Sequence, residues 1–228
     1  MKTPLLLLHG ALGSQQQLQA LAQLLATDYH IHLLNFAGHG GRANTADFSM
    51  ELFVENVVDY LQENQLQQVS IFGYSMGGYV ALCLALKHPH LVNKIVTLGT
   101  KFNWSQEAAA KEVKMLNPTI IAQKVPKFAA HLQATHAPND WKVVLEQTAQ
   151  MMLGLANGNQ LQVEDLQQIQ QEVCIGIGSL DNMVTVEESQ KAAAALPQGT
   201  CQLLEGVYHP LEKNEQQVLA EYISHFLD

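Results

Sequence analysis

The stretch Gly73-Tyr74-Ser75-Met76-Gly77-Gly78 decides how this chain is expected to fold. The apolar run at 69–72 before it predicts a buried strand, and the segment 76–88 after it predicts a helix that stops before a proline. A serine on such a tight strand-to-helix turn has its hydroxyl raised above the sheet, with helix amides behind it. The pattern indicates a catalytic nucleophile at Ser75, and the alternative is a tight turn without a catalytic role.

Strands and helices alternate on both sides of this turn. The expected strands are 5–8, 30–35, 69–72, 94–98, 173–177 and 200–204. The expected helices are 15–26, 50–64, 76–88, 186–195 and 212–227. Such alternation predicts an α/β fold with a mostly parallel sheet of about six strands and helices on both faces.

The alternation is interrupted once, in the segment 101–171. Helical patterns follow one another there with no convincing strand, so residues 1–100 and 172–228 are expected to form the core and 101–171 a helical lid. An ordinary helical subdomain is the alternative. We expect apolar side chains to line an acyl pocket beneath the lid, with Leu12, Trp141 and Met152 as candidate substrate contacts.

A serine nucleophile needs a histidine base and a carboxylate that orients it. His209 follows the last expected strand and Asp181 follows the preceding one, which gives the chain order Ser75, Asp181, His209. His39, in a glycine-rich loop, is the main competing base. Asp140 and Asp165 lie in the helical insertion and are typical of helix starts.

The loop after the first strand, Leu8-His9-Gly10-Ala11-Leu12-Gly13, is placed to complete an oxyanion hole. The backbone N–H of Ala11 would pair with that of Met76. The alternative is a simple glycine turn into a helix, and His9 is expected to be structural rather than catalytic.

Composition narrows the classes of partner. The chain has 228 residues and a formal net charge of -9, which disfavours nucleic acid and anionic membrane surfaces. The three cysteines form no C-x-x-C pair and are expected to be reduced core thiols. No stretch is long and apolar enough to span a bilayer, so a cytoplasmic protein is expected. No metal or cofactor is expected. The sequence leaves monomer and homodimer open.

Four motifs in this order resemble the α/β-hydrolase superfamily, and within it the small, lidded esterase and enol-lactonase type. They are His9-Gly10, Gly38-His39-Gly40, the serine turn at 73–77, and the pair of Asp181 and His209. The resemblance covers nearly the whole chain outside the lid. It implies that the positions of Ala11 and Met76 supply the oxyanion amides.

Two departures from that family's pattern are visible. The loop 35–42 lacks the Asp, Pro and Ser that the family often shows there, although no triad position is affected. The chain begins at the strand that carries the oxyanion loop, so the sheet is expected to be trimmed to about six strands.

These observations predict a serine hydrolase that cleaves a small to medium, largely apolar carboxylic ester or lactone through an acyl-enzyme. The alternatives are a lyase or C–C bond hydrolase on the same triad, and a non-catalytic ligand receptor of the same fold. No cluster of arginines faces the predicted site, so a strongly anionic substrate is disfavoured. Arg42 is the one basic residue near a sheet-edge loop, and it is expected to be exposed.

Overall fold

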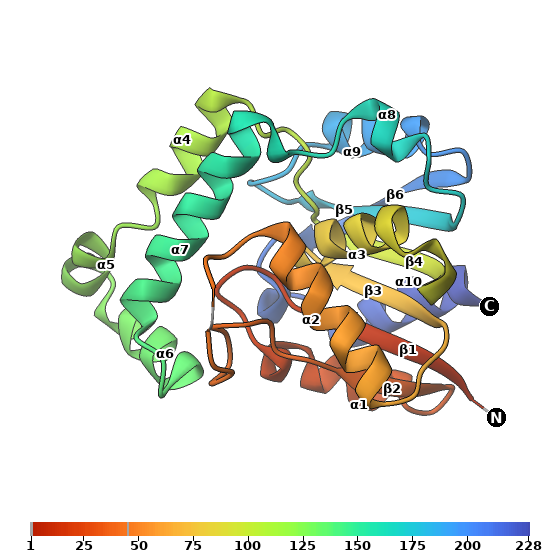
Figure 1. Ribbon diagram of the computed structural model, residues 1–228, viewed down its shortest axis with the longest axis horizontal. Coiled ribbons are helices and arrows are strands. Elements are labelled where there is room, and N and C mark those ends of the chain that lie inside the picture. Colours follow the sequence, from red (N-terminus) through yellow and green to blue (C-terminus); the bar gives the residue numbers. More distant parts are fainter. Residues whose placement is uncertain (1, 45) are drawn as a thin grey trace.

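The computed structural model describes residues 2–44 and 46–228. A sheet of six parallel strands in the order β2-β1-β3-β4-β5-β6 crosses the molecule (Figure 1). The strands are β1 (Thr3–Leu8), β2 (Tyr29–Leu33), β3 (Val69–Tyr74), β4 (Val92–Leu98), β5 (Glu172–Leu180) and β6 (Gly199–Tyr208). The predicted strand number and parallel arrangement are confirmed.

The last two strands run further than their apolar cores. They were expected to end at residues 177 and 204, yet β5 reaches Leu180 and β6 reaches Tyr208, and these two residues are paired. Backbone pairing between β5 and β6 continues beyond their continuous apolar runs, so hydropathy alone underestimates the length of these strands. The extension brings the chain directly to Asp181 and His209.

Helices cover both faces of the sheet. They are α1 (Gln19–Leu25), preceded by the 3₁₀ turn η1 (Gln15–Leu18), α2 (Met50–Glu63), α3 (Met76–Lys87), α9 (Val186–Ala195) and α10 (Gln216–Leu227). Short 3₁₀ turns η2 (Pro89–Leu91) and η4 (Leu211–Lys213) precede β4 and α10. The C-terminal helix thus begins later than the predicted residue 212, because η4 occupies that segment.

The leucines of β1 show how the core is divided. Leu6 and Leu8 pack in the cluster that includes α2 and α3, whereas Leu5 and Leu7 pack in the cluster of α1 and α10. Successive side chains of a strand point to opposite faces, so a continuous apolar run is what a strand buried on both faces requires. All four leucines are fully buried.

The segment between β4 and β5 is helical throughout its regular structure, as predicted. It holds α4 (Gln106–Lys114), α5 (Pro118–Lys124), α6 (Pro126–His136), α7 (Trp141–Gly154), the π-helical turn η3 (Leu155–Asn159) and α8 (Val163–Leu166). Figure 1 shows α4 to α7 grouped beside the end of the sheet towards which the strands point. The short helix α8 packs instead against α3 and α9.

Side-chain caps explain where several of these helices begin. Asp140 caps α7 by accepting a hydrogen bond from the backbone of Lys142. Asp165 forms a capping box with Gln162 at the start of α8. Both aspartates therefore have the helix-start role that the sequence indicated.

Candidate active site

Ser75 occupies a strained turn between β3 and α3. Its φ of 51° and ψ of -113° lie in a region that side-chain-bearing residues rarely adopt. Its N–H donates to the Leu98 carbonyl at 2.8 Å, and the Thr100 hydroxyl donates to the Ser75 carbonyl at 3.0 Å. These two bonds from the end of β4 hold the turn in place.

The glycines around Ser75 are required by close backbone approach. A side-chain carbon on Gly73 would lie 2.4 Å from Cα of Gly78, and one on Gly77 would lie 2.4 Å from the carbonyl oxygen of Leu8. Real Cβ atoms do not come so close to backbone atoms. The tight turn that the sequence indicated is therefore possible only with glycine at these positions.

Asp181 and His209 form the second half of the site. Nδ1 of His209 donates to Oδ2 of Asp181 at 2.7 Å, and the two side chains are 8% and 2% exposed. The other carboxylate oxygen accepts the backbone N–H groups of Met183 at 2.8 Å and Val184 at 2.9 Å. With Nδ1 carrying the shared proton, Nε2 of a neutral His209 is left as an acceptor.

Ser75 and His209 line one cavity, together with Ala11 and Met76. A side-chain carbon on Gly10 would lie 3.3 Å from Cβ of Ser75, so the loop after β1 passes beside the serine. Met76 begins α3, where helix geometry leaves backbone N–H groups without intrahelical partners. The hydrogen bonds of the described residues include none between Ser75 and His209, a contact that often forms only when substrate binds.

The cavity measures about 50 Å³, and most of its wall is apolar. Its other apolar lining residues are Met50, Tyr79, Trp104, Met151, Met152, Leu155, Met183 and Val184. Met152 thus lies where the sequence placed it. A wall rich in methionine can adapt to acyl groups of different shape.

Leu12 and Trp141 are not among the described residues that line this cavity. Trp141 packs with Ile121, Leu132 and Leu145 inside the inserted helices, and Leu12 contacts the same cluster. Sequence could not separate the core residue Trp141 from the wall residue Met152, because both are apolar and both lie on α7.

A larger hollow of about 320 Å³ lies next to the first cavity. Met50, Met151 and Leu155 line both, so their side chains form a partition between the two spaces. The larger hollow has a more polar wall that includes Asp47, Ser49 and Asn159.

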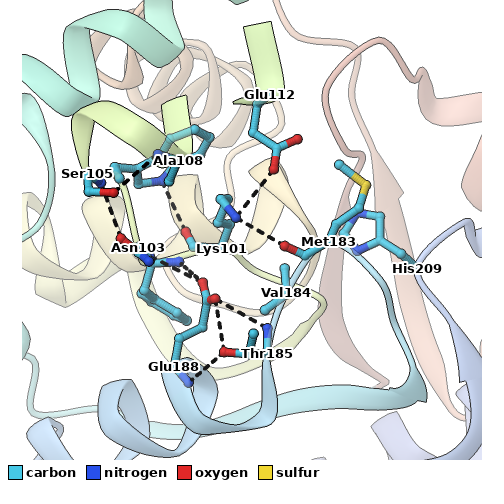
Figure 2. A network of polar contacts seen from close by, with 12 residues as sticks. Lys101, Asn103, Ser105, Ala108, Glu112, Met183, Val184, Thr185, Glu188 and His209 are labelled. Atoms are coloured by element: carbon cyan, nitrogen blue, oxygen red, sulfur yellow. Dashed lines mark hydrogen bonds and ion pairs between the residues drawn. The ribbon is translucent and has the colours of Figure 1, made fainter. Parts of the chain in front are cut away.

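Two charged residues of the cavity were missed in the sequence. Nζ of Lys101 lies 3.4 Å from Oε1 of Glu112 and donates to the carbonyl of Met183 at 3.0 Å (Figure 2). Lys101 lies three residues after Leu98, the end of β4, and therefore at the same edge of the sheet as Ser75. This position is the feature of the sequence that could have identified Lys101 as a residue of the site. Arg42, which was expected to be exposed, is instead half-buried and donates to the Asn35 carbonyl.

The competing base His39 does not line the cavity that Ser75 and His209 share. It is fully buried, stacks on Phe48 at 5.0 Å between ring centroids, and its Nδ1 donates to the Ala37 carbonyl at 3.0 Å. Burial holds its pKa well below the ordinary value. Its position does not suit the role of base for Ser75, and a ring with so low a pKa is also a weak base.

His9 has a structural role. Its Nδ1 donates to the Gly10 carbonyl at 2.8 Å and its Nε2 accepts the Phe36 N–H at 3.2 Å. Burial lowers the pKa of His9 to about 4, so the ring is neutral and both nitrogens are used in positioning the loop.

Other features of the described chain add no further site. Within residues 2–44 and 46–228, no three His, Cys, Asp or Glu side chains are grouped to hold a metal ion. Cys83 and Cys174 are buried free thiols and Cys201 is a half-buried one. None of the described helices has the length and apolar character needed to cross a membrane.

Comparison with known proteins identifies the family and the fold. The model of the alpha/beta hydrolase fold family matches residues 3–211. A probable alcohol acetyltransferase of Cyberlindnera jadinii is 35% identical over 99 residues, a match that covers 42% of this chain but 28% of that protein. A thermophilic esterase from Thermogutta terrifontis superposes with a TM-score of 0.80 at 16% identity, over 100% of this chain and 90% of that chain.

A second solved structure extends the range of chemistry found on this fold. The 2-hydroxy-6-oxo-6-phenylhexa-2,4-dienoate hydrolase of a Rhodococcus strain has a TM-score of 0.82 and 14% identity, over 99% of this chain and 90% of that chain. At such identity a likeness establishes the fold alone.

Proposed function

This chain belongs to the alpha/beta hydrolase fold family, and we propose that it is a serine hydrolase of small carboxylic esters or lactones. The observation that carries the proposal is the meeting of Ser75 and a buried His209–Asp181 pair at one small, mainly apolar cavity. Family membership and esterase-like neighbours support an enzyme, and the particular substrate and the triad are our inference.

In the proposed first half-reaction, the Ser75 hydroxyl attacks the substrate carbonyl carbon while Nε2 of His209 takes its proton. The tetrahedral intermediate collapses, and His209 returns that proton to the departing alcohol oxygen. Asp181 orients the ring and stabilises its protonated form through the 2.7 Å hydrogen bond. An acyl group is left on Ser75.

In the second half-reaction, His209 takes a proton from water, which attacks the acyl carbonyl, and Ser75 leaves with the proton from His209. Negative charge on the carbonyl oxygen would be stabilised by the backbone N–H groups of Ala11 and Met76 in both halves. The closeness of the Gly10 loop to Ser75 supports this assignment.

The cavity favours short acyl groups. Its volume of about 50 Å³ leaves little room beyond Ser75 unless the methionines move. The helices α4 to α7 lie beside the carboxyl ends of the strands and contribute Met151 and Met152 to the wall. We therefore propose that the segment 101–171 acts as a lid that selects the acyl group.

Acyl transfer to an alcohol is the second candidate. The resemblance to a probable alcohol acetyltransferase favours it, since an acyl-enzyme can be resolved by an alcohol in place of water. The two activities share every step up to the acyl-enzyme and differ only in the acceptor.

Turnover of p-nitrophenyl acetate, propionate, butyrate and hexanoate, with and without added ethanol, tests the proposal. We expect p-nitrophenol release that is fastest for the shorter esters and falls by several orders of magnitude in Ser75→Ala. Ethyl ester among the products would show transfer, and free acid alone would show hydrolysis. Ser70→Ala, a neighbouring serine on β3, is the control and should remain active. Wild-type protein that releases no p-nitrophenol would contradict the proposal.

A further inference from the structure

The cavity beside Ser75 has one charged wall. Lys101, at the start of the helical insertion, and Glu112, on α4, both line it among otherwise mainly apolar residues. Their side chains are 15% and 6% exposed, and they form an ion pair at 3.4 Å. The proposed reaction uses neither residue.

The contacts within the protein leave part of each group unused. An ammonium has three N–H donors. Lys101 donates to the Met183 carbonyl, forms the ion pair with Glu112 (Figure 2) and lies 6.0 Å from the centroid of the Trp104 ring, and the described residues supply it with no further oxygen acceptor. One oxygen of Glu112 faces Lys101, while the other points away and receives no hydrogen bond from the described chain. A carboxylate oxygen on a side chain only 6% exposed is costly to leave without a partner.

Packing alone does not account for the pair. The ion pair does connect α4 with the loop after β5, because Glu112 lies on α4 and Lys101 donates to the carbonyl of Met183 in that loop. The N–H of Met183 in turn donates to Asp181. That connection uses two contacts of the Lys101 ammonium but only one of the two Glu112 oxygens. A buried ion pair is in itself weak evidence for stability, because desolvation offsets the attraction between the charges.

We propose that Lys101 and Glu112 bind a hydroxyl group on the acyl part of the substrate, so that the preferred substrates are short hydroxyacyl esters or the corresponding lactones. A hydroxyl can accept from the ammonium and donate to the free carboxylate oxygen at the same time. A carboxylate would face Glu112 and an ammonium would face Lys101, so the neutral pair disfavours both charged groups. This inference rests on the proposed esterase function and names its substrate class.

The test compares ethyl butanoate with ethyl 2-hydroxybutanoate and each enantiomer of ethyl 3-hydroxybutanoate, with acid release followed by pH-stat. We expect kcat/KM of the wild-type protein for at least one hydroxy ester to exceed that for ethyl butanoate by about tenfold or more. In Lys101→Met/Glu112→Leu this ratio should fall to about one or below, since neither hydrogen-bonding partner remains. Glu112→Gln, which keeps the shape of the side chain, should give an intermediate ratio if the double variant does not fold.

Lys111 is an exposed lysine on α4, next to Glu112. Lys111→Met is therefore the matched control and should keep the wild-type ratio. A purely structural role would lower activity on all four esters together and leave the ratio unchanged, which would overturn the inference. A wild-type ratio near one for every hydroxy ester would also overturn it while leaving the esterase proposal intact. Absence of turnover on every ester would overturn the proposed function and this inference with it.

Discussion

A side-chain carbon on Gly99 would lie 3.0 Å from Nδ1 of His209, the atom that donates to Asp181. Gly99 follows β4 and adopts a φ of +64°, which favours glycine. Its N–H donates to the Gly176 carbonyl at 3.0 Å. The end of β4 thus lies directly against the hydrogen bond that orients the proposed base.

Gly99→Ala should therefore reduce kcat for p-nitrophenyl acetate by at least about tenfold, because a small displacement of a catalytic group has a large effect on rate. Gly158→Ala is the control, since Gly158 also has a positive φ, +107°, but nothing lies within 4 Å of the added carbon. Steady-state kinetics of the two variants, with urea unfolding of each, separates crowding from backbone strain. Equal losses of activity in both would contradict the account.

Met151→Ala should extend the acyl chain that the protein accepts. Met151 is part of the partition between the small cavity and the larger hollow, and its truncation would join them. Each additional buried methylene then contributes up to about 0.8 kcal/mol, or roughly fourfold in kcat/KM. The ratio of hexanoate to acetate ester turnover measures the effect. Met115→Ala, at an exposed methionine, is the control and should leave the ratio unchanged. An unchanged ratio in Met151→Ala would contradict the role of Met151 in the partition.

Trp141 and Met152 lie on the same helix and should behave differently when changed to alanine. Met152 lines the cavity, so Met152→Ala should alter relative kcat/KM across the ester series. Trp141 belongs to the core of the inserted helices, so Trp141→Ala should lower the free energy of unfolding by about 3 to 5 kcal/mol. Kinetics and urea unfolding of both variants decide the matter. A change in ester preference in Trp141→Ala that matches that in Met152→Ala would contradict this division of roles.

Three buried histidines should make the fold sensitive to acid. Burial lowers the pKa of His9 to about 4, that of His39 well below its ordinary value, and that of His136 below it. The unfolded chain therefore binds protons that the folded chain excludes. The contribution of these histidines to the free energy of unfolding is fully present above the ordinary pKa of 6.5. It is lost as the pH falls from there towards 4, by up to about 1.4 kcal/mol per pH unit for His9.

Urea unfolding at pH 7.5, 6.5, 5.5 and 5 measures this slope. His136→Gln should reduce it, because glutamine can accept from the Gly40 N–H and donate to the Leu12 carbonyl without titrating. His225→Gln, at an exposed position on α10, should leave the slope as it is. A wild-type protein as stable at pH 5 as at pH 7.5 would contradict the interpretation.

The sheet could be predicted from the sequence because the residues that indicate it lie close together in the chain. The four leucines of β1 and the glycines around Ser75 are dictated by burial on both faces and by backbone contact, and each is visible in a short stretch. Strand ends were less visible, because the pairing of Leu180 with Tyr208 depends on a neighbour that is distant in the chain.

The candidate site was predictable to the extent that topology determines it. Residues that follow parallel strands meet at one edge, which is how Asp181 could be paired with His209 over 28 residues. The wall of the cavity was predictable only in part: Met152 was expected there, but the face that α4 presents depends on packing. Glu112 therefore looked like any other charge on a helix.

The proposed reaction passes through an acyl-enzyme at Ser75, which mass spectrometry can detect. The protein is mixed with excess p-nitrophenyl acetate, quenched in acid during turnover, digested and mapped. We expect an acetyl group on Ser75 in the wild-type protein and no acetyl group at this position in Ser75→Ala. An acetyl group found during turnover on another residue and not on Ser75, or turnover by Ser75→Ala at the wild-type rate, would contradict the proposed reaction.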